Sequence, residues 1–401
     1  MIMDHSLYPT KGLPDNFTSF DLLESAGYIK QISSGFYAFL PLGVELLQNI
    51  SRAVRKTATH YSFGEVNMPL LQDISLWQQS ERIRKYGDSL FTVTNPNGSN
   101  FIVGPTYEEA ILKLYVKLGL SDESLPWKVF RIGECERNET RPAFGLIRSK
   151  SFILADFYVL TANEVSANEA VEELQGIVRQ VLNGFGLQFH VAKYLQRNNA
   201  WSFWMDSESK QCTPTFCYSC GESYRSFDTL ERCPHCNSAN LSVHNGIELA
   251  DVATSYDNIS IPLGAKRRNG EHIHLAFAGI GISRLVQILA EQNHDKSGLI
   301  WPYDIAPYKT QIVTNKIRKQ EAIGVYDLLM KNNIKTILDI RELSMGKKFV
   351  DADLVGCPIH IILGTNTATG VTELKNRIDG TKQRIPTMDV PRFIMGGENT
   401  V

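Results

Sequence analysis

Two long stretches of the chain place apolar residues at the spacing of an amphipathic helix. In residues 44–58 and 164–182, four apolar side chains fall on one helical face: Leu46, Leu47, Ile50 and Val54 in the first, and Val171, Leu174, Val178 and Val181 in the second. Gly184 and Gly186 then favour an end to the second helix, because glycine is a poor helix former. The pattern therefore predicts two amphipathic helices that each bury one face.

The chain around these helices is dominated by short strand-like runs. Residues 100–160 contain FIVG, KVFRI and SFILADFYVL, whose β-branched and aromatic residues are typical of strands. At 205–240 cysteine, serine and asparagine become abundant and apolar runs vanish, and from 245 to 303 the order is strand, glycine-rich turn and helix. The pattern predicts a sheet that is interrupted by a small polar insertion.

The C-terminal part of the chain alternates strands and helices. It follows WPYDIAP at 301–307, which contains Pro302 and Pro307 and is predicted to be a linker. YKTQIV, KTILDI and IHIILG resemble strands, and EAIGVYDLLMK between the first two has helical spacing. This alternation predicts a small α/β domain with a partly parallel sheet.

Composition narrows the class of protein. A chain of 401 residues is long enough for two or three domains, and 43% apolar with 21% charged residues is the balance of a globular protein. A net charge of −2 excludes a generally basic nucleic-acid-binding chain but leaves room for a local basic patch. No apolar run approaches the ~18 residues of a membrane span, and the first residues resemble neither a signal nor a transit peptide. We expect a cytoplasmic enzyme that does not contact a membrane.

Four of the seven cysteines have the spacing of a metal site. Cys217-x-x-Cys220 is followed, after twelve residues, by Cys233-Pro-His-Cys236. Two such pairs can surround one tetrahedral Zn²⁺, and four sulfur ligands leave no position for water, so the site is predicted to be structural. The alternative is four free thiols in a collapsed loop. Cys135, Cys212 and Cys357 have no partner at such spacing and are interpreted as structural residues.

A pattern of charged and aromatic residues on two predicted strands fits a nucleotide site. Arg137-x-Glu139 is followed by Arg148, Phe152 and Asp156. On an antiparallel hairpin, an arginine can bind the α-phosphate, a carboxylate can accept from the adenine amino group, and an aromatic ring can stack on the base. The alternative is a solvated strand face, on which charges also alternate.

A second candidate element is the glycine-rich turn in AGIGISRLVQIL at 278–289. Glycine lets the backbone approach a ligand closely, and Arg284, at the start of the following helix, can reach a terminal phosphate. The alternative is an ordinary tight junction between a strand and a helix.

The chain as a whole resembles the class II aminoacyl-tRNA synthetases, and among them the prolyl-tRNA synthetases without an editing insertion. Five segments follow that family's order: 25–43 (SAGYIKQISSGFYAFLPLG), 104–110 (GPTYEEA), 125–152, 278–307 and 338–358. The resemblance implies an α+β fold: an antiparallel catalytic sheet of six strands flanked by helices, a small four-cysteine zinc ribbon where relatives carry the insertion, and a C-terminal α/β anticodon-binding-like domain.

The resemblance also implies roles for single residues. For ATP these are Arg137 at the α-phosphate, Glu139 at adenine, Phe152 in base stacking, Arg284 at the γ-phosphate, and Arg148 and Glu248 nearby, with Glu248 helping to hold Mg²⁺. Arg137 and Arg284 are the expected catalytic residues. Thr106 and Glu108 match the T-x-E that holds the amino group of the substrate. Glu136 departs from the family, which usually has an aromatic residue there.

The expected amino-acid site combines Thr106, Glu108 and Arg137 with two positions that depart from the prolyl pattern, Asp251 and Phe277. A Gly-His pair becomes Ala250-Asp251, a cysteine becomes Phe277, and a histidine becomes Thr161. We therefore predict that proline is not the best substrate, and that a small polar or cationic side chain suits the site better. The alternative is that Trp201, Phe203 and Trp204 rebuild a proline-shaped pocket.

The segment LDIRELSMGKKFVDADL matches the anticodon-binding pattern at Asp339, Arg341, Gly346, Lys347, Lys348, Phe349 and Asp351, with Ile340 where a second aspartate is usual. Its lysines and arginine are expected to contact RNA phosphates, and the alternative is a solvated charged helix. The predicted division is 1–205 for the first part of the catalytic domain (motifs 1 and 2), 206–244 for the zinc ribbon, 245–304 for the second part (motif 3), and 305–401 for the anticodon-binding-like domain.

The leading hypothesis is an enzyme that activates an amino acid with ATP and Mg²⁺ and transfers it to tRNA. The alternatives are a paralogue that delivers a different amino acid to a carrier protein or a small molecule, and a non-catalytic regulatory protein. A homodimer is expected, because the family builds its two-fold interface from the first predicted helix and the strand ending at Pro69. The ribbon contains no ATP-motif residue, so it is expected to serve stability rather than chemistry.

Overall fold

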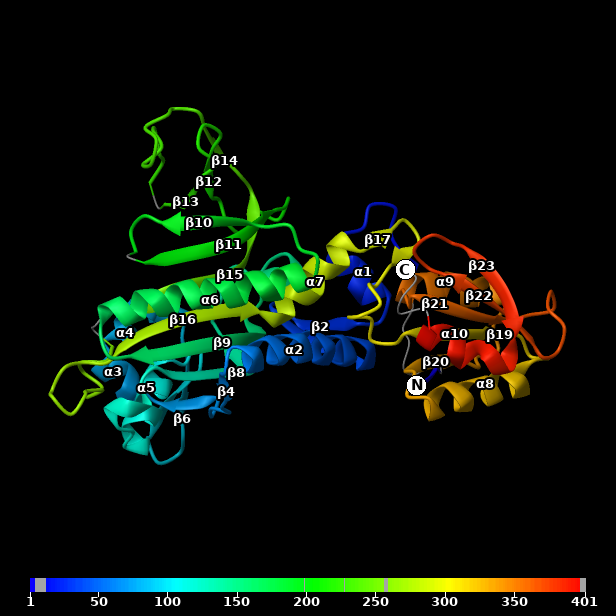
Figure 1. Ribbon diagram of the computed structural model, residues 1–401, viewed down its shortest axis with the longest axis horizontal. Helices are drawn as coiled ribbons and strands as arrows, with labels where there is room; N and C mark the ends of the chain where they lie inside the picture. Colours follow the sequence, from blue (N-terminus) through cyan, green and yellow to red (C-terminus); the bar gives the residue numbers. More distant parts are fainter. Residues whose placement is uncertain (4–11, 198, 227, 256–258, 397–401) are drawn as a thin grey trace. The chain divides into compact units, whose positions relative to one another are not determined.

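The computed structural model describes residues 1–3, 12–197, 199–226, 228–255 and 259–396. The chain divides into two compact units (Figure 1). One comprises Ser34–Phe36 and Ser51–Leu285, and the other comprises Met1–Ser33, Tyr37–Ile50 and Val286–Val401. Among the described residues, no helix has the length and apolar character needed to cross a bilayer. The four-part division drawn from the sequence motifs stays a prediction.

A mixed sheet of ten strands forms the larger unit (Figure 1). Six neighbouring strands in it are antiparallel, which is the number that the resemblance implied. In spatial order they are β10 (His190–Tyr194), β11 (Ala200–Asp206), β15 (Gly246–Ser255), β16 (His274–Gly281), β9 (Ser151–Thr161) and β8 (Trp127–Glu136). β4 (Gly64–Glu65) extends the sheet beyond β8, and β13 (Ser223–Arg225), β12 (Thr215–Cys217) and β14 (Leu241–Val243) extend it beyond β10.

The helix predicted at 164–182 is α6 (Glu164–Gly184), and it packs along β15, β16 and β9 (Figure 1). It buries the four predicted apolar residues, Val171, Leu174, Val178 and Val181. Its N-terminus is capped by Asn163, whose side chain accepts a hydrogen bond from the Ser166 amide at 2.9 Å. Because α6 covers one face of the sheet, β9 can be apolar on both sides along most of its length.

The helix predicted at 44–58 is α2 (Pro41–His60), which begins three residues earlier at a proline, a favoured first residue of a helix. Leu46, Ile50 and Val54 on its predicted apolar face are fully buried. A second layer in the larger unit consists of short elements that carry the T-x-E segment: α3 (Ile74–Gln79), α4 (Arg82–Tyr86), α5 (Glu108–Leu118), and a sheet of β5 (Leu71–Asp73), β7 (Asn100–Val103) and β6 (Phe91–Thr94). The glycine-rich turn joins β16 to α7 (Ile282–Gln292), as predicted.

The second unit contains the predicted α/β sheet. Its strands, in order, are β1 (Ile2–Met3), β20 (Thr336–Asp339), β19 (Thr310–Thr314), β21 (Ile359–Leu363), β22 (Val371–Asn376) and β23 (Lys382–Pro386). The first four are parallel and the last two are antiparallel, so the sheet is partly parallel, as predicted. Its helices are α8 (Lys319–Lys331), α9 (Met345–Val355) and α10 (Val390–Gly396). The unit also contains α1 (Ser19–Ser25), β2 (Ile29–Ser33), most of β3 (Phe36–Phe39), and the pair β17 (His294–Asp295) and β18 (Gly298–Leu299).

The segment predicted to be a linker, 301–307, is part of this second unit. Trp301 is fully buried, and its indole Nε1 donates a hydrogen bond to the hydroxyl of Tyr28 at 2.6 Å. The segment has no helix or strand, but it is anchored in a core rather than exposed. The prolines that suggested a linker therefore lie in irregular backbone inside this unit.

Candidate active site

A cavity of about 360 Å³, here called the first cavity, opens against the strands of the large sheet. It is formed by the hairpin of β8 and β9, by β15, and by the junction of β16 and α7. All six residues that the sequence assigned to ATP line it: Arg137, Glu139, Arg148, Phe152, Glu248 and Arg284. Residues that are up to 147 positions apart, from Arg137 to Arg284, thus meet on one surface.

The two arginines of the first cavity are held by backbone oxygens. Arg137 Nε donates to the carbonyl of Pro105 at 3.1 Å, and its guanidinium carbon lies 5.1 Å from the ring centre of Phe152. Arg284 donates to the carbonyl of Ile147 at 3.2 Å and to the carbonyl of Glu248. Among the described residues, neither guanidinium forms an ion pair. Burial lowers the pKa of Arg284, and the positive charge of Arg137 acts in the same direction. An anion in the cavity would relieve both effects.

Two carboxylates line the first cavity close to these arginines. Glu248 Oε2 accepts hydrogen bonds from the hydroxyls of Tyr194 and Ser202, both at 2.7 Å. Asp251 lies opposite Gly279 on the neighbouring strand, and a Cβ at that glycine would come within 2.9 Å of Asp251 Oδ1. Burial, reinforced by Glu248, raises the pKa of Asp251 to about 6. Two carboxylates in one cavity are the ligands that Mg²⁺ prefers.

Glu139 and Arg148 form an ion pair at 2.8 Å at the edge of the first cavity. The amide of Arg141 also donates to Glu139 Oε1 at 3.1 Å. The arginine contact lowers the pKa of Glu139, so this carboxylate is ionised and can accept a further hydrogen bond. Ser149 Oγ, in the same cavity, is buried without a hydrogen-bond partner in the described part of the chain. A buried hydroxyl of this kind fits a site that a polar ligand completes.

Asp156, the last residue of the nucleotide pattern, does not line the first cavity. It is buried in an ion pair with Arg131 at 2.7 Å. The Arg131 guanidinium also lies 3.6 Å from the ring centre of Tyr107. This pair belongs to the core that supports the hairpin, because both side chains are almost fully buried.

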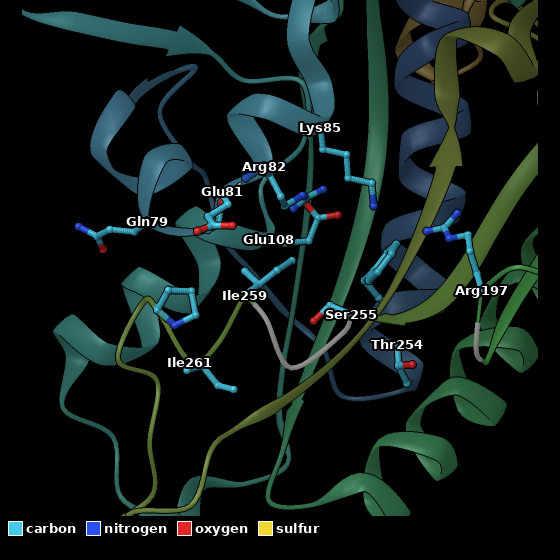
Figure 2. A pocket seen from close by; sticks show the side chains of 13 residues that line it. Gln79, Glu81, Arg82, Lys85, Glu108, Arg197, Thr254, Ser255, Ile259 and Ile261 are labelled. Atoms are coloured by element: carbon cyan, nitrogen blue, oxygen red, sulfur yellow. Dashed lines mark hydrogen bonds and ion pairs between the residues drawn. The ribbon is translucent and has the colours of Figure 1, made fainter.

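A second cavity, of about 450 Å³, contains Glu108 of the T-x-E segment (Figure 2). Thr106 donates to Glu108 Oε2 at 2.5 Å, and Arg82 contacts Glu108 at 3.2 Å and Glu109 at 3.0 Å. Figure 2 shows Arg82 and Lys85 beside Glu108, with Arg197 on the opposite side of the cavity. The sequence did not predict these three cations near Glu108, because no spacing pattern links them to it.

The residues assigned to the amino acid divide between the two cavities. Glu108 and Phe277 line the second cavity, Arg137 and Asp251 line the first, and Thr106 positions Glu108. The hydrogen bond from Arg137 to Pro105, next to Thr106, indicates that the cavities adjoin. Thr161 lines neither of them. It is buried at the end of β9, where its hydroxyl donates to the carbonyl of Asn163 at 3.3 Å.

The aromatic residues that could have rebuilt a proline-shaped pocket lie elsewhere. Phe203 and Trp204 are fully buried, and Trp201, Phe203 and Trp204 line neither cavity. They belong to β11, where His190 on the next strand stacks 4.8 Å from Trp204. Phe277, and none of these three residues, therefore borders the space of the second cavity.

The four paired cysteines come together in the ribbon. One ligand atom from each of Cys217, Cys220, Cys233 and Cys236 lies within 4.8 Å of the others. The sulfurs of Cys217 and Cys236, and those of Cys220 and Cys233, are each 3.6 Å apart. This arrangement is compatible with a tetrahedral zinc site. The remaining cysteines are buried singly, and burial raises the pKa of the Cys135 and Cys212 thiols to about 12.

The C-terminal segment predicted to contact RNA contains a buried charge network, here called the Asp–Arg network (Asp339, Arg341, Lys347, Lys348 and Asp351). Arg341 pairs with Asp339 at 2.7 Å and with Asp351 at 2.8 Å, and all three are buried. Lys348 is also buried, and its Nζ donates to the carbonyls of Thr314 and Asp339 at 2.8 and 3.0 Å. Only Lys347 is largely exposed, and it pairs with Asp351 at 2.8 Å.

Arg341 and Lys348 were expected to offer their charges to RNA phosphates, and in the structure both charges already have protein partners, so that contact stays a prediction. Their charged groups are turned to protein oxygens and hold β19, β20 and α9 together. Gly346 and Phe349 lie on α9 as the pattern required. Arg341 and Lys348 also line a cavity of about 220 Å³, together with Lys316 and Lys319, two lysines that the sequence pattern did not single out.

Comparison with known proteins gives the class of this protein. Residues 91–293 match the class II core domain of the tRNA synthetases for G, H, P, S and T, and residues 305–395 match an anticodon binding domain. The chain therefore belongs to the class II aminoacyl-tRNA synthetases, and it is a ligase.

Within that class, the chain is similar to proteins named proline–tRNA ligase. The one from Ehrlichia ruminantium is 29% identical over 381 residues, which are 88% of this chain and 89% of the relative. The one from Rickettsia bellii is 27% identical over 400 residues, covering 90% of each chain.

Solved structures of prolyl-tRNA synthetases share the fold. The Cryptosporidium parvum protein, complexed with halofuginone and AMPPNP, has a TM-score of 0.73 at 15% identity, covering 95% of this chain and 76% of its own. The Giardia lamblia protein, in complex with prolyl-adenylate, has a TM-score of 0.73 at 19% identity, covering 93% of this chain and 75% of its own.

Proposed function

We propose that the protein condenses an amino acid with ATP to an aminoacyl-adenylate and transfers the aminoacyl group to tRNA. The observation that carries this proposal is the pair Arg137 and Arg284, two guanidiniums that share one cavity without an acidic partner among the described residues. A triphosphate would offer each guanidinium the direct ion pair that it lacks among the described residues. The match to an anticodon binding domain supports tRNA as the acceptor, and with it a cytoplasmic location.

The reaction needs positioning and electrostatic stabilisation rather than a general base. A carboxylate oxygen of the amino acid bonds to the α-phosphorus, the bond to the β-phosphate breaks in line, and pyrophosphate leaves. Arg137 neutralises charge at the α-phosphate and the carboxylate, and Arg284 binds the far end of the triphosphate. Glu139 accepts from the adenine amino group, with Arg148 holding it in place, and Phe152 stacks on the base.

Glu248 and Asp251 fit a magnesium site. Glu248 uses one oxygen for two hydroxyl donors, so its other oxygen remains available for the metal or its water. Mg²⁺, when bound with ATP, neutralises charge on the phosphates. Asp251 lies on the same strand and faces the same cavity, where a cation would relieve the cost of burying it.

For the amino acid, Thr106 and Glu108 accept the substrate ammonium, and the second cavity takes its side chain. The names of the relatives make proline the reference substrate. Phe277 lines the same cavity as Glu108 and narrows it relative to a cysteine, so we expect proline to be used poorly. Transfer to a carrier protein or a small molecule is the second candidate, and an RNA acceptor assay separates it from tRNA charging.

An amino-acid screen for ATP–pyrophosphate exchange, followed by charging of total tRNA, tests the proposed function. We expect exchange with at least one amino acid and charging with the same one. Exchange without tRNA charging would favour the carrier or small-molecule alternative. No exchange with any amino acid would contradict the proposal and favour a regulatory protein.

We further propose one structural Zn²⁺ per chain, held by Cys217, Cys220, Cys233 and Cys236. Elemental analysis of protein purified without chelator should give a value near one. A value near zero, with the four thiols freely titratable in the folded protein, would show a collapsed loop instead.

A homodimer is proposed on the family's use of the α2 region as an interface. Ile32 and Val44, which flank the segment 36–39 in the sequence, are 71% and 40% exposed in the single chain. The proposed interface would cover these two side chains. Light scattering at micromolar concentration should give twice the mass of 45.1 kDa, and a monomer would contradict the proposal.

A further inference from the structure

The strands of the four-cysteine ribbon are hydrogen-bonded into the large sheet and do not form a separate module. Its strand β13 pairs in parallel with β10, with Tyr194 opposite Arg225. The amide of Leu195 donates to the carbonyl of Arg225 at 3.0 Å. At the base of the ribbon, Cys212 and Gly246 exchange two backbone hydrogen bonds of 2.8 and 2.9 Å. The ribbon therefore meets the sheet at two places, and both are next to Glu248.

Arg225, on the ribbon strand, lies beside Tyr194 of β10. Its guanidinium carbon is 5.7 Å from the ring centre of Tyr194, the residue directly opposite it in the strand pairing. Arg197 lies 5.1 Å from the same ring centre. Tyr194 in turn donates its hydroxyl proton to Glu248 Oε2 at 2.7 Å. One side chain, Tyr194, thus connects the ribbon to the candidate metal ligand.

A second contact from the base of the ribbon acts on the backbone of Glu248. Gln211, the residue before Cys212, accepts a hydrogen bond from the Glu248 amide through its side-chain oxygen at 2.8 Å. Glu248 is consequently held at its carboxylate by a tyrosine that Arg225 contacts, and at its amide by a residue at the ribbon's entry. If the ribbon lost its fold, both supports would be free to move.

We infer that Arg225 is a positioning residue, through which the folded four-cysteine ribbon orients Glu248 for binding of the metal–ATP complex. The inference rests on the proposed role of Glu248 in holding Mg²⁺. The Arg225 guanidinium lies against the Tyr194 ring while the Tyr194 hydroxyl donates to Glu248 Oε2, so the cation holds the ring in place and Glu248 Oε1 is left for the ligand. The sequence alone predicted a purely stabilising ribbon, because the pairing of β13 with β10 leaves no local pattern.

The test is the affinity for ATP, measured by calorimetry in chelator-free buffer from which Mg²⁺ has been removed beforehand, once with Mg²⁺ added back and once without it. Arg225→Ala and the nearly isosteric Tyr194→Phe are each expected to weaken binding of Mg–ATP roughly 5- to 10-fold. Metal-free ATP binding should stay unchanged, because Arg137 and Arg284 are untouched. Zinc content should stay at one per chain, and Arg225→Lys should recover part of the affinity. Cys233→Ser, which removes a zinc ligand, should show the same magnesium-dependent loss in the fraction that folds.

Arg232→Ala is the matched control, because this exposed ribbon arginine contacts only the carbonyl of Asn237, at 3.1 Å, among the described residues. It should bind Mg–ATP normally. Glu248→Gln distinguishes the positioning role of Arg225 from the proposed role of Glu248 in holding Mg²⁺. If Glu248→Gln weakens Mg–ATP binding while Arg225→Ala and Tyr194→Phe do not, the positioning role is overturned and the proposed function stands. If Glu248→Gln itself has no effect, the role of Glu248 in holding Mg²⁺ falls, and the inference falls with it.

Discussion

Each unit of the chain contains a cluster of arginine and acidic side chains, and the two clusters satisfy their charges differently. In the first cavity, Arg137 and Arg284 donate to backbone carbonyls, and Glu248 accepts from hydroxyls. In the Asp–Arg network, Arg341 binds two aspartates directly and Lys348 is enclosed by carbonyls. The residue types are the same, but Arg137 and Arg284 form no ion pair among the described residues, whereas Arg341 forms two.

This difference separates a binding site from a structural element more clearly than charge content does. Burying a charge is costly unless a partner compensates it, so an uncompensated cluster persists only where a ligand supplies the missing charge. We therefore expect substitutions in the two clusters to have different effects. Removing a charge from the Asp–Arg network should cost stability, whereas removing one from the first cavity should cost activity and can even increase stability.

The largest effect is expected for Arg341→Ala. It leaves Asp339 and Asp351 buried with fewer partners, and breaking a buried pair typically costs about 3–5 kcal/mol. Urea unfolding of the variant should show a loss of that order. Pyrophosphate exchange by the folded fraction should stay near normal, because the network does not belong to the first cavity.

Lys316→Ala is the control for this substitution, since Lys316 is exposed on the neighbouring cavity. It should leave the free energy of unfolding unchanged and lower the affinity for tRNA if that cavity receives RNA. A loss below about 1 kcal/mol for Arg341→Ala would show that solvent reaches the network, and the contrast between the clusters would disappear.

Arg137→Ala should have the next largest effect. Removal of one charge-assisted contact to the reacting phosphate typically costs ~10²-fold in rate, or about 2.7 kcal/mol. We expect that loss in kcat/KM for pyrophosphate exchange, with little change in the free energy of unfolding. Arg179→Ala, an exposed arginine on α6, should retain exchange. Arg131, six residues before Arg137, is unsuitable as a control because its buried pair with Asp156 makes it a structural residue. Near-normal exchange by Arg137→Ala would show that Arg137 does not stabilise the transition state.

Much of this architecture could be predicted from the sequence, because its signals are local. The apolar period of α2 and α6, the alternation in the C-terminal part, and the spacing of the four cysteines each specify an element over a short stretch. The six residues assigned to ATP were predicted through motif order, and the structure brings all six to one cavity. The antiparallel run of six strands followed from the resemblance and not from strand patterns alone.

The errors and omissions involve side chains whose partners are distant in the sequence. A charged pattern such as RELSMGKK does not reveal whether the charges meet solvent or Asp339, Thr314 and other buried oxygens. Prolines around Trp301 suggested a linker, since its contact with Tyr28 spans 273 positions. Three arginines were missed for the same reason: Arg82, Arg197 and Arg225. The role of each depends on a side chain that it contacts in the folded chain, and no sequence pattern reveals that contact.

A smaller effect is expected when the second cavity is enlarged. Phe277→Cys removes most of a side chain that lines the same cavity as Glu108. If overfilling limits the use of proline at a cost of about 1–3 kcal/mol, the variant should gain roughly tenfold in kcat/KM for proline in pyrophosphate exchange. The preferred amino acid of the parent should lose activity in parallel. A parent protein that already prefers proline by tenfold would end this explanation and make Phe277 part of a proline pocket.

The smallest expected effect compares the same substitution, aspartate to asparagine, in the two clusters. Burial raises the pKa of Asp251 to about 6, from 3.8 in the unfolded chain. Between about pH 4 and pH 6 the folded state therefore binds more protons than the unfolded state, and stability falls as the pH rises through this range. The cost is fully present above pH 6. Asp251→Asn removes this cost of burying a charge. The variant should therefore be more stable than the parent at pH 7.5, by on the order of 1 kcal/mol because the site is partly open to water, and as stable as the parent near pH 4.

Asp351→Asn should do the opposite at pH 7.5 and destabilise the protein, since it takes a carboxylate oxygen from Arg341 and Lys347. Urea unfolding at the two pH values measures both. If both substitutions destabilise the protein at pH 7.5, then Asp251 is already compensated within the chain, and the contrast between the two clusters does not hold for their aspartates.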